Sequence, residues 1–176
     1  MALEQTSGVL IRDARPEEVA VAGAVVRAAY DQFKADYPSE SWERWIAMIG
    51  DLSHYADDGQ ILVAERDGEI IGSVTFYPDA SKSGQGDWPA GSAGILRLAV
   101  LPSHRGGGLG RALVEECMRR AQDLGVPSVA LHTTEWMAVA RPMYERIGFY
   151  QAPEFDFHTR TGVIGLGYRY DFGAKT

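Results

Sequence analysis

Apolar and polar positions follow two periods along this chain, the period of a helix and the alternation or short apolar run of a strand. Pro16, Glu17 and Glu18 stand where a helix begins, because proline and acidic side chains suit a first turn. Asp67-Gly68 separates two apolar runs and is typical of a hairpin turn. A segment rich in Gly and Ser over residues 79–94 predicts a long loop.

The order of these signals predicts a mixed α/β arrangement. The first half is rich in hairpins, whereas a plain dinucleotide-binding fold alternates strand and helix throughout. No repeat and no linker divides the sequence, so we expect a single domain over residues 1–176. The predicted strands cover residues 8–14, 61–66, 69–78, 95–102, 126–134, 154–158 and 162–171, and the predicted helices cover 16–33, 40–49, 108–124 and 138–149.

Composition narrows the classes of function. The chain carries 17 basic and 24 acidic side chains, a net charge of −7 at pH 7. This balance argues against nucleic acid as the main partner, which needs clustered Lys and Arg, and it is compatible with a cationic small substrate. No apolar run approaches the roughly 20 residues that cross a bilayer. The N-terminal residues show no secretion signal, so we expect a cytoplasmic protein that acts away from membranes.

The segment HRGGGLGRAL, from His104 to Leu113, places four glycines at the start of a predicted helix. Glycine in a helix costs about 1 kcal/mol relative to alanine, so this density needs a reason. Bare backbone amides at a helix N-terminus can approach a phosphate closely, and Arg105 and Arg111 add positive charge. A flexible loop without a ligand is the alternative, which the flanking strand and helix disfavour.

Two common phosphate-binding loops do not fit this segment. Gly110 is followed by Arg-Ala, so the Lys and the hydroxyl side chain of a Walker A loop are missing, and Arg111 replaces the third glycine of a dinucleotide fingerprint. The pattern R-x-x-G-x-G does fit, with Arg105, Gly108 and Gly110. With the later segment ARPMYERIGFY (residues 140–150), it resembles the acetyl-CoA-binding motif of the GNAT superfamily of N-acetyltransferases.

The resemblance implies an acyl-CoA N-acyltransferase fold, with a splayed central sheet flanked by helices. It implies transfer of an acetyl group from acetyl-CoA to a primary amine of a small molecule or peptide, by direct attack in a ternary complex. In this family the strand before the glycines carries a bulge, and its backbone holds the pantetheine arm. The N–H of Leu98 would polarise the thioester carbonyl. The cofactor-binding residues so implied are Leu98, Ala99 and Val100 on the strand, and Arg105, Gly106, Gly107, Gly108, Leu109, Gly110 and Arg111 on the turn.

Tyr144 matches the family's usual general acid, which protonates the departing CoA thiolate. Its helical spacing from Ala140, Met143 and Ile147 also suits a core aromatic residue. Both roles are compatible, because the ring can pack while the hydroxyl reaches a cleft.

Two positions depart from the family's pattern. Met137 stands where an Asn often helps to hold the cofactor, and Arg97 stands on the strand that often carries a glutamate base. A guanidinium cannot accept a proton, so the base lies elsewhere or a water chain serves. His132 and Glu135, at the end of the following strand, are the candidate bases. The missing glutamate also favours an alternative function, an acyl-CoA-binding sensor that has lost catalysis.

The acceptor and the assembly are less constrained by the sequence. The histidines and Cys117 show no metal-ligand spacing, so we expect no metal, and Cys117 suits a buried helix face. Exposed sheet edges near the C-terminal hairpin favour a homodimer. A pocket for a small cationic amine is one interpretation of the aromatic and acidic side chains before residue 90, and simple packing of the tryptophans is the other. These side chains are Tyr30, Asp31, Tyr37, Trp42, Trp45, Asp87 and Trp88.

Overall fold

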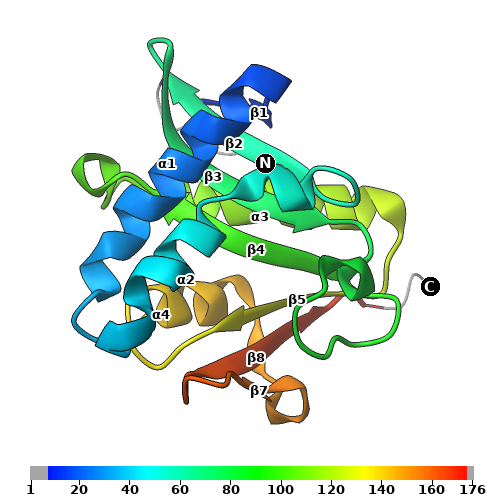
Figure 1. Ribbon diagram of the computed structural model, residues 1–176. Coiled ribbons are helices and arrows are strands. Elements are labelled where there is room, and N and C mark those ends of the chain that lie inside the picture. Colours follow the sequence, from blue (N-terminus) through cyan, green and yellow to red (C-terminus); the bar gives the residue numbers. More distant parts are fainter. Residues whose placement is uncertain (1–7, 174–176) are drawn as a thin grey trace.

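The computed structural model describes residues 8–173, in which eight strands form one mixed sheet (Figure 1). The strand order is β1-β2-β3-β4-β5-β8-β6, and β7 pairs with β8. The β4–β5 pair is parallel and the other pairs are antiparallel. The strands are β1 (Leu10–Asp13), β2 (Gln60–Arg66), β3 (Glu69–Tyr77), β4 (Ala93–Val100), β5 (Ser128–Thr133), β6 (Tyr150–Gln151), β7 (Phe157–His158) and β8 (Ile164–Asp171).

Helices cover both faces of the sheet (Figure 1). In β2, Ile61 and Val63 pack against α1 and α2, whereas Leu62 and Ala64 pack against α3 and α4. This division follows from the pleat, which points successive side chains to opposite faces. The helices are α1 (Val19–Tyr30), α2 (Trp42–Ile49), α3 (Leu109–Leu124) and α4 (Ala140–Ile147). Short 3-10 turns connect the longer elements; they are η1 (Pro16–Glu18), η2 (Asp31–Phe33), η3 (Ser39–Ser41), η4 (Leu52–Tyr55), η5 (Ala80–Ser83), η6 (Pro102–His104) and η7 (Pro153–Phe155).

The central strand β4 is irregular in two ways. Ser73 of β3 faces Ala99, but Thr75 faces Leu96, so β4 has one extra residue in the pairing. This β-bulge includes Arg97, whose φ of 55° lies in the left-handed region. Beyond Ile95, which faces Leu131, β4 and β5 are no longer paired, so the two strands separate toward their C-terminal ends. The predicted splayed sheet is therefore confirmed.

The predicted order of the main elements is confirmed, with differences at the C-terminal end. The expected strand over 154–158 is wrong in part, because Pro153–Phe155 forms η7 and only Phe157–His158 is strand. The sequence analysis also missed β6, which pairs with Tyr168 and Arg169 of β8. Two residues are too few for a period to be seen, and the pairing depends on a distant strand. Cys117 is buried in the core as predicted, and burial raises the pKa of its thiol.

The close approach of α1 and the end of α2 depends on two glycines. A Cβ added to Gly23 would overlap the carbonyl oxygen of Gly50, which also accepts a hydrogen bond from Arg27 over 3.2 Å. A Cβ on Gly50 would lie 2.5 Å from Cγ of Arg27. This contact holds α2, and with it one wall of the cavity described below, against α1.

We expect Gly23→Ala to lower the free energy of unfolding by roughly 1–3 kcal/mol, because the added methyl group overpacks the helix contact. At an ordinary helix position the same substitution raises the free energy of unfolding by about 1 kcal/mol, so the expected effect at Gly23 has the opposite sign. Urea unfolding measures the difference, and Ala24→Gly at the exposed neighbouring position calibrates helix propensity in α1. A Gly23→Ala variant more stable than the wild type would contradict the close approach.

Candidate active site between strands β4 and β5

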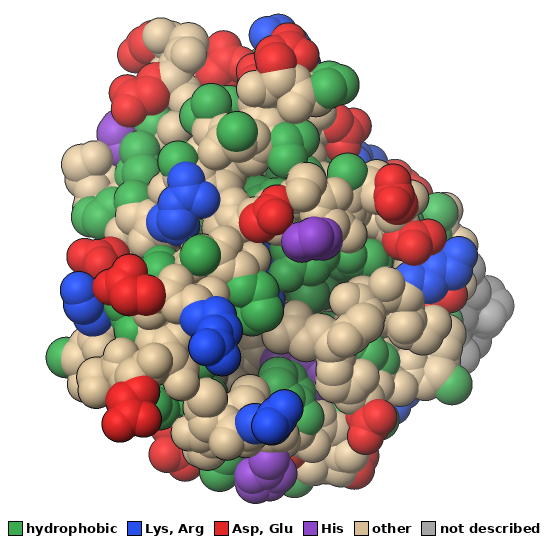
Figure 2. All heavy atoms as spheres, in the orientation of Figure 1, with side chains coloured by type: hydrophobic (Ala, Val, Ile, Leu, Met, Phe, Trp, Pro, Cys, Tyr) green, Lys and Arg blue, Asp and Glu red, His purple; other side chains and the backbone are tan. Residues whose placement is uncertain are grey.

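A cavity of about 320 Å³ opens where β4 and β5 separate. Figure 2 shows a hollow at the centre of this face, with hydrophobic side chains in its walls and basic side chains beside it. The lining residues come from α1, α2 and the segment between them, from the β3–β4 loop, from β4 and β5, from the β5–α4 segment and α4, and from β7, β8 and the loop that joins them. The cavity is therefore built by segments far apart in the sequence.

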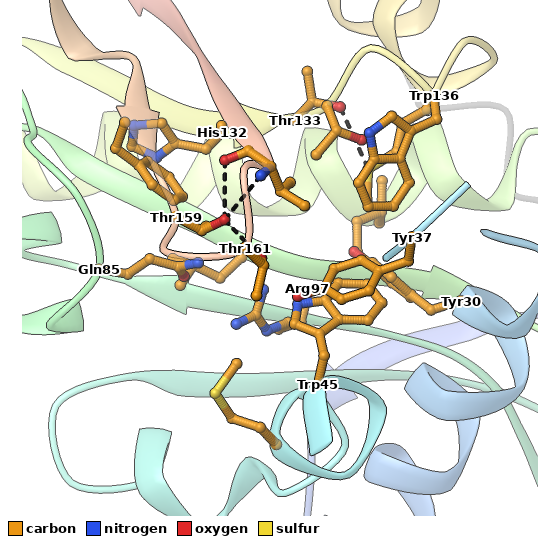
Figure 3. Close-up of a pocket in the computed structure, with 18 of the residues that line it drawn as sticks. Tyr30, Tyr37, Trp45, Gln85, Arg97, His132, Thr133, Trp136, Thr159 and Thr161 are labelled. Carbon is orange, nitrogen blue, oxygen red and sulfur yellow. Dashed lines mark hydrogen bonds between the residues drawn. The ribbon is translucent and has the colours of Figure 1, made fainter. Parts of the chain in front are cut away.

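Aromatic side chains form two sides of the cavity. We call Tyr30, Tyr37, Trp45 and Trp136 the aromatic wall (Figure 3). Within it, Tyr37 stacks on Trp45 with 4.5 Å between ring centroids, and Trp136 lies 5.7 Å from Tyr37. On the other side, the ring of His132 lies 4.5 Å from Trp88 and 4.9 Å from Phe157.

The predicted acceptor residues divide into two groups. Tyr30, Tyr37, Trp45 and Trp88 line the cavity, as expected. Asp31, Asp87 and Trp42 do not, so the interpretation as an acid-lined pocket is wrong for these positions. The two aspartates are exposed, because each lies on the outer side of its turn or loop, and Trp42 is 3% exposed in contact with Tyr37 and Trp45.

The position of Tyr144 is compatible with both a core aromatic residue and the predicted general acid. Its ring belongs to the core and meets Phe149 edge to face at 5.9 Å, yet the residue also lines the cavity. Burial raises the pKa of its phenol well above the usual value of 10.0. The hydroxyl therefore keeps its proton at neutral pH, which a general acid requires. Tyr30, a second buried phenol, also lines the cavity and also has a raised pKa.

His132 lines the cavity from the end of β5. Its Nε2–H donates to the carbonyl oxygen of Phe155 over 2.8 Å, which leaves Nδ1 as the acceptor nitrogen. Nδ1 is buried and has no hydrogen-bond partner among the described residues. Burial lowers the pKa of the ring, against the smaller effects of the Phe155 carbonyl and of Asp156 and Asp87. Glu135, the other candidate base, is exposed and does not line the cavity.

Strand β4 offers backbone donors beside the cavity. The amide of Leu101 donates to the carbonyl of Ile71 in β3 over 2.9 Å. Amides of an extended strand point alternately to its two edges, so those of Ala99 and Leu101 face β3. The amides of Leu98 and Val100 then face the edge from which β5 has separated.

The glycine turn leads from β4 into α3. Gly106 and Gly108 have φ values of 84° and 80°, which other residues rarely adopt. A Cβ on Gly106, Gly107 or Gly108 would meet nothing within 4 Å, so packing does not explain these glycines. The first helical hydrogen bond joins the amide of Ala112 to the carbonyl of Gly108 over 3.0 Å. The amides of Leu109, Gly110 and Arg111 precede it and suit an anion.

The two arginines beside the turn are engaged elsewhere. Arg105 donates from Nη2 to the carbonyl of Ala29 at the end of α1, over 2.9 Å. Arg111 forms an exposed ion pair with Glu115, with 2.7 Å between Nε and Oε1. An anion at the turn would therefore meet the backbone amides rather than these two side chains.

Between residues 8 and 173, no three His, Cys, Asp or Glu side chains gather as metal ligands would. No helix in the same range has the length and apolar character to span a bilayer.

Comparison with known proteins identifies the family. The model of the acetyltransferase (GNAT) family matches residues 23–149. The chain belongs to the GNAT acetyltransferase family. The family named from the glycine turn and the segment around Tyr144 is thus confirmed, and so is the fold class.

Individual relatives of this GNAT protein are distant. N-acetyltransferase family 8 member 2 of Rattus norvegicus is 30% identical over 110 residues, which cover 61% of this chain and 46% of the relative. The matched part is thus less than half the length of that protein. Among solved structures, the PaiA N-acetyltransferase of Thermoplasma acidophilum in complex with coenzyme A has a TM-score of 0.71 at 20% identity, covering 93% of this chain and 99% of that one. A GNAT acetyltransferase of Brucella melitensis in complex with acetyl-CoA has a TM-score of 0.64 at 23% identity, covering 96% and 90%.

The lowered pKa of His132 predicts how stability depends on pH. The ring is neutral in the fold, while in the unfolded chain it takes up a proton near its ordinary value of 6.5. The free energy of unfolding therefore decreases as pH falls below about 6.5, by at most about 1.4 kcal/mol per pH unit, until the pKa of the folded state is reached. Urea unfolding between about pH 7.5 and 5.5 measures this slope.

His132→Gln removes the titrating ring and keeps an amide that can donate to the Phe155 carbonyl. We expect the slope below pH 6.5 to become shallower in this variant and to stay unchanged in His158→Gln, which changes an exposed histidine. The burial argument fails if His132→Gln and the wild type show the same slope.

Proposed function

We propose that this protein transfers an acetyl group from acetyl-CoA to a primary amine by direct attack in a ternary complex. The observation that carries the proposal is the succession of three features: the cavity that contains Tyr144, the edge of β4 from which β5 has separated, and the open glycine turn at the start of α3. Family membership supports the same activity.

Backbone groups of the turn and of β4 would hold acetyl-CoA. The amides of Leu109, Gly110 and Arg111 would bind the diphosphate at the positive end of the α3 dipole. The bare surface of Gly106, Gly107 and Gly108 lets the phosphates approach. The amides of Leu98 and Val100 would bind the pantetheine arm, and acetyl-CoA supplies the activated acyl group as a thioester.

Leu98 and Tyr144 would act on the thioester group of acetyl-CoA. The amide of Leu98 would donate to the acyl carbonyl oxygen, where negative charge develops during attack. Tyr144 holds a proton at neutral pH because burial raises its pKa, and it would give that proton to the departing sulfur.

The base has to accept a proton from the attacking amine. His132 supports this role better than Glu135, because His132 lines the cavity and its Nδ1 is an unoccupied acceptor. Its lowered pKa places the corresponding limb of the pH–activity profile below the ordinary value of 6.5.

Gly107→Val tests the diphosphate cradle. A side chain at Gly107 meets no protein atom within 4 Å, and its φ is outside the left-handed region, so the fold tolerates the change. We expect the affinity for acetyl-CoA in calorimetric titration to fall about ten-fold or more, with ATP and NAD as negative controls. Gly173→Val, at an equally open glycine, is the matched control. Unchanged binding in Gly107→Val, with both variants folded, would contradict a ligand on this turn.

Tyr144→Phe tests the general acid. We expect kcat for thiol release to fall by about 10² or more, while acetyl-CoA affinity in calorimetry stays the same, because only the proton donor is removed. Tyr170→Phe, which changes a half-buried ring outside the cavity, is the matched control. Tyr30→Phe separates the two buried phenols, and a larger loss in Tyr30→Phe than in Tyr144→Phe would move the acid role to Tyr30.

A sensor that binds acyl-CoA without catalysis is the second candidate, favoured by the lack of a carboxylate among the described residues that line the cavity. Calorimetric binding of acetyl-CoA without thiol release, across a broad panel of amines, would support it.

A further inference from the structure

The cavity is basic although the protein is acidic. Three arginines line it, Arg44 from α2, Arg97 from the bulge of β4 and Arg160 from the β7–β8 loop. Among the described residues no Asp or Glu lines it, and the ion pairs recorded for them include none of these arginines. A cavity with this charge disfavours a cationic acceptor and favours an anionic group.

Arg97 is the most buried of the three and is incompletely paired. Its Nη2 donates to the hydroxyl of Tyr55 over 3.2 Å, and the guanidinium lies 5.9 Å from the centre of the same ring. Its Nε is buried and has no hydrogen-bond partner among the described residues. Arg97 is half-buried, and an opposite charge on a ligand would offset the cost of holding this cation partly out of water.

The surroundings of Arg97 leave room for that ligand. In Figure 3 its side chain points into the cavity between the aromatic wall and the Thr159–Thr161 side of the β7–β8 loop. That loop is closed on itself, because Thr159 Oγ1 accepts from the amide of Val163 over 3.0 Å. A planar guanidinium matches a carboxylate with two parallel hydrogen bonds.

Two acidic side chains near His132 do not neutralise the charge of Arg97. Asp87 and Asp156 are close enough to influence His132, yet neither lines the cavity, and Asp156 accepts from the amide of Gly167 over 2.7 Å. The phosphates of CoA are not the partner either, because no residue of the turn from 102 to 111 lines the cavity.

We infer that the acceptor is a small amine that carries a carboxylate and an apolar or aromatic body, as an apolar amino acid does, and that Arg97 binds the carboxylate. The aromatic wall contacts the body. A volume of about 320 Å³ suits a small molecule, at the lower end of the usual range of ligand cavities. This inference rests on the proposed function, because it names the acceptor of the same reaction.

A panel of matched acceptors tests the inference by thiol release with saturating acetyl-CoA. The panel contains L-phenylalanine, L-tryptophan and L-leucine, each beside its C-terminal amide, which keeps the body and removes the carboxylate. We expect kcat/KM to be about ten-fold or more higher for the acids, with the difference in KM. Equal or better activity on the amides would overturn the inference.

Variants of Arg97 test the residue itself. Arg97→Gln is expected to raise KM for the acids about ten-fold or more and leave KM for the amides unchanged, and Arg97→Lys to restore part of the preference. Arg66→Gln is the matched control, since Arg66 is also half-buried with an unpartnered Nε but lies outside the cavity. A loss for acids and amides alike in Arg97→Gln would assign Arg97 a structural role only.

A binding measurement keeps the inference testable without turnover. Trp45 and Trp136 line the cavity, so their fluorescence reports on ligands placed there. We expect N-acetyl-L-phenylalanine to change the emission at about ten-fold lower concentration than its amide, and Arg97→Gln to abolish the difference. Acetyl-CoA binding without a preference for the carboxylate overturns this inference and leaves the proposed function intact. A preference for the carboxylate without acetyl-CoA binding overturns the proposed function, and with it the assignment of an acceptor, and leaves only a carboxylate-binding site at Arg97.

Discussion

The structure depends on the point at which β4 stops pairing with β5. Parallel pairing ends at Ile95 and Leu131, and the bulge that follows places Arg97 in a left-handed conformation within β4. A strand that loses its partner inside a sheet leaves backbone groups without hydrogen bonds, which is costly unless water or a ligand satisfies them. The same interruption therefore creates the cavity and turns the amides of Leu98 and Val100 toward it. Water or a ligand would have to accept their hydrogen bonds.

The walls around this opening are held by packing on both faces of the sheet. On one face, Gly23 and Gly50 let α2 approach α1, which places the Tyr37–Trp45 stack over the cavity. On the other face, α4 fixes Tyr144 through the core contact with Phe149. Rigid elements thus position the side chains that line the cavity, and such preorganised geometry limits the entropy that a ligand would lose on binding.

Electrostatics in the cavity differ from those of the whole protein. A net charge of −7 is spread over exposed side chains, many of them in ion pairs such as Arg111 with Glu115. In the cavity the unbalanced charge is positive, and burial shifts the pKa of Tyr144 upward and that of His132 downward. Both shifts favour the neutral side chain, because a poorly solvated site penalises ionisation. Local desolvation, rather than net charge, therefore governs the chemistry available here.

The sequence alone determined the order of elements, the glycine turn and the place of Tyr144, because each depends on local signals. Helix starts, the Asp67-Gly68 turn and the R-x-x-G-x-G pattern act over a few residues, so they can be recognised without the fold. The family follows from the R-x-x-G-x-G pattern together with the segment at residues 140–150.

Only the tertiary structure decided which side chains share the cavity. Asp87 and Trp88 are adjacent in the sequence, yet one is exposed and the other lines the cavity. In the sequence, Arg97 only replaces a base, whereas in the fold it lines one cavity with Arg44 and Arg160, and no carboxylate is among the described lining residues. These relations depend on the bulge and on contacts between distant segments, and periodicity carries no information about either.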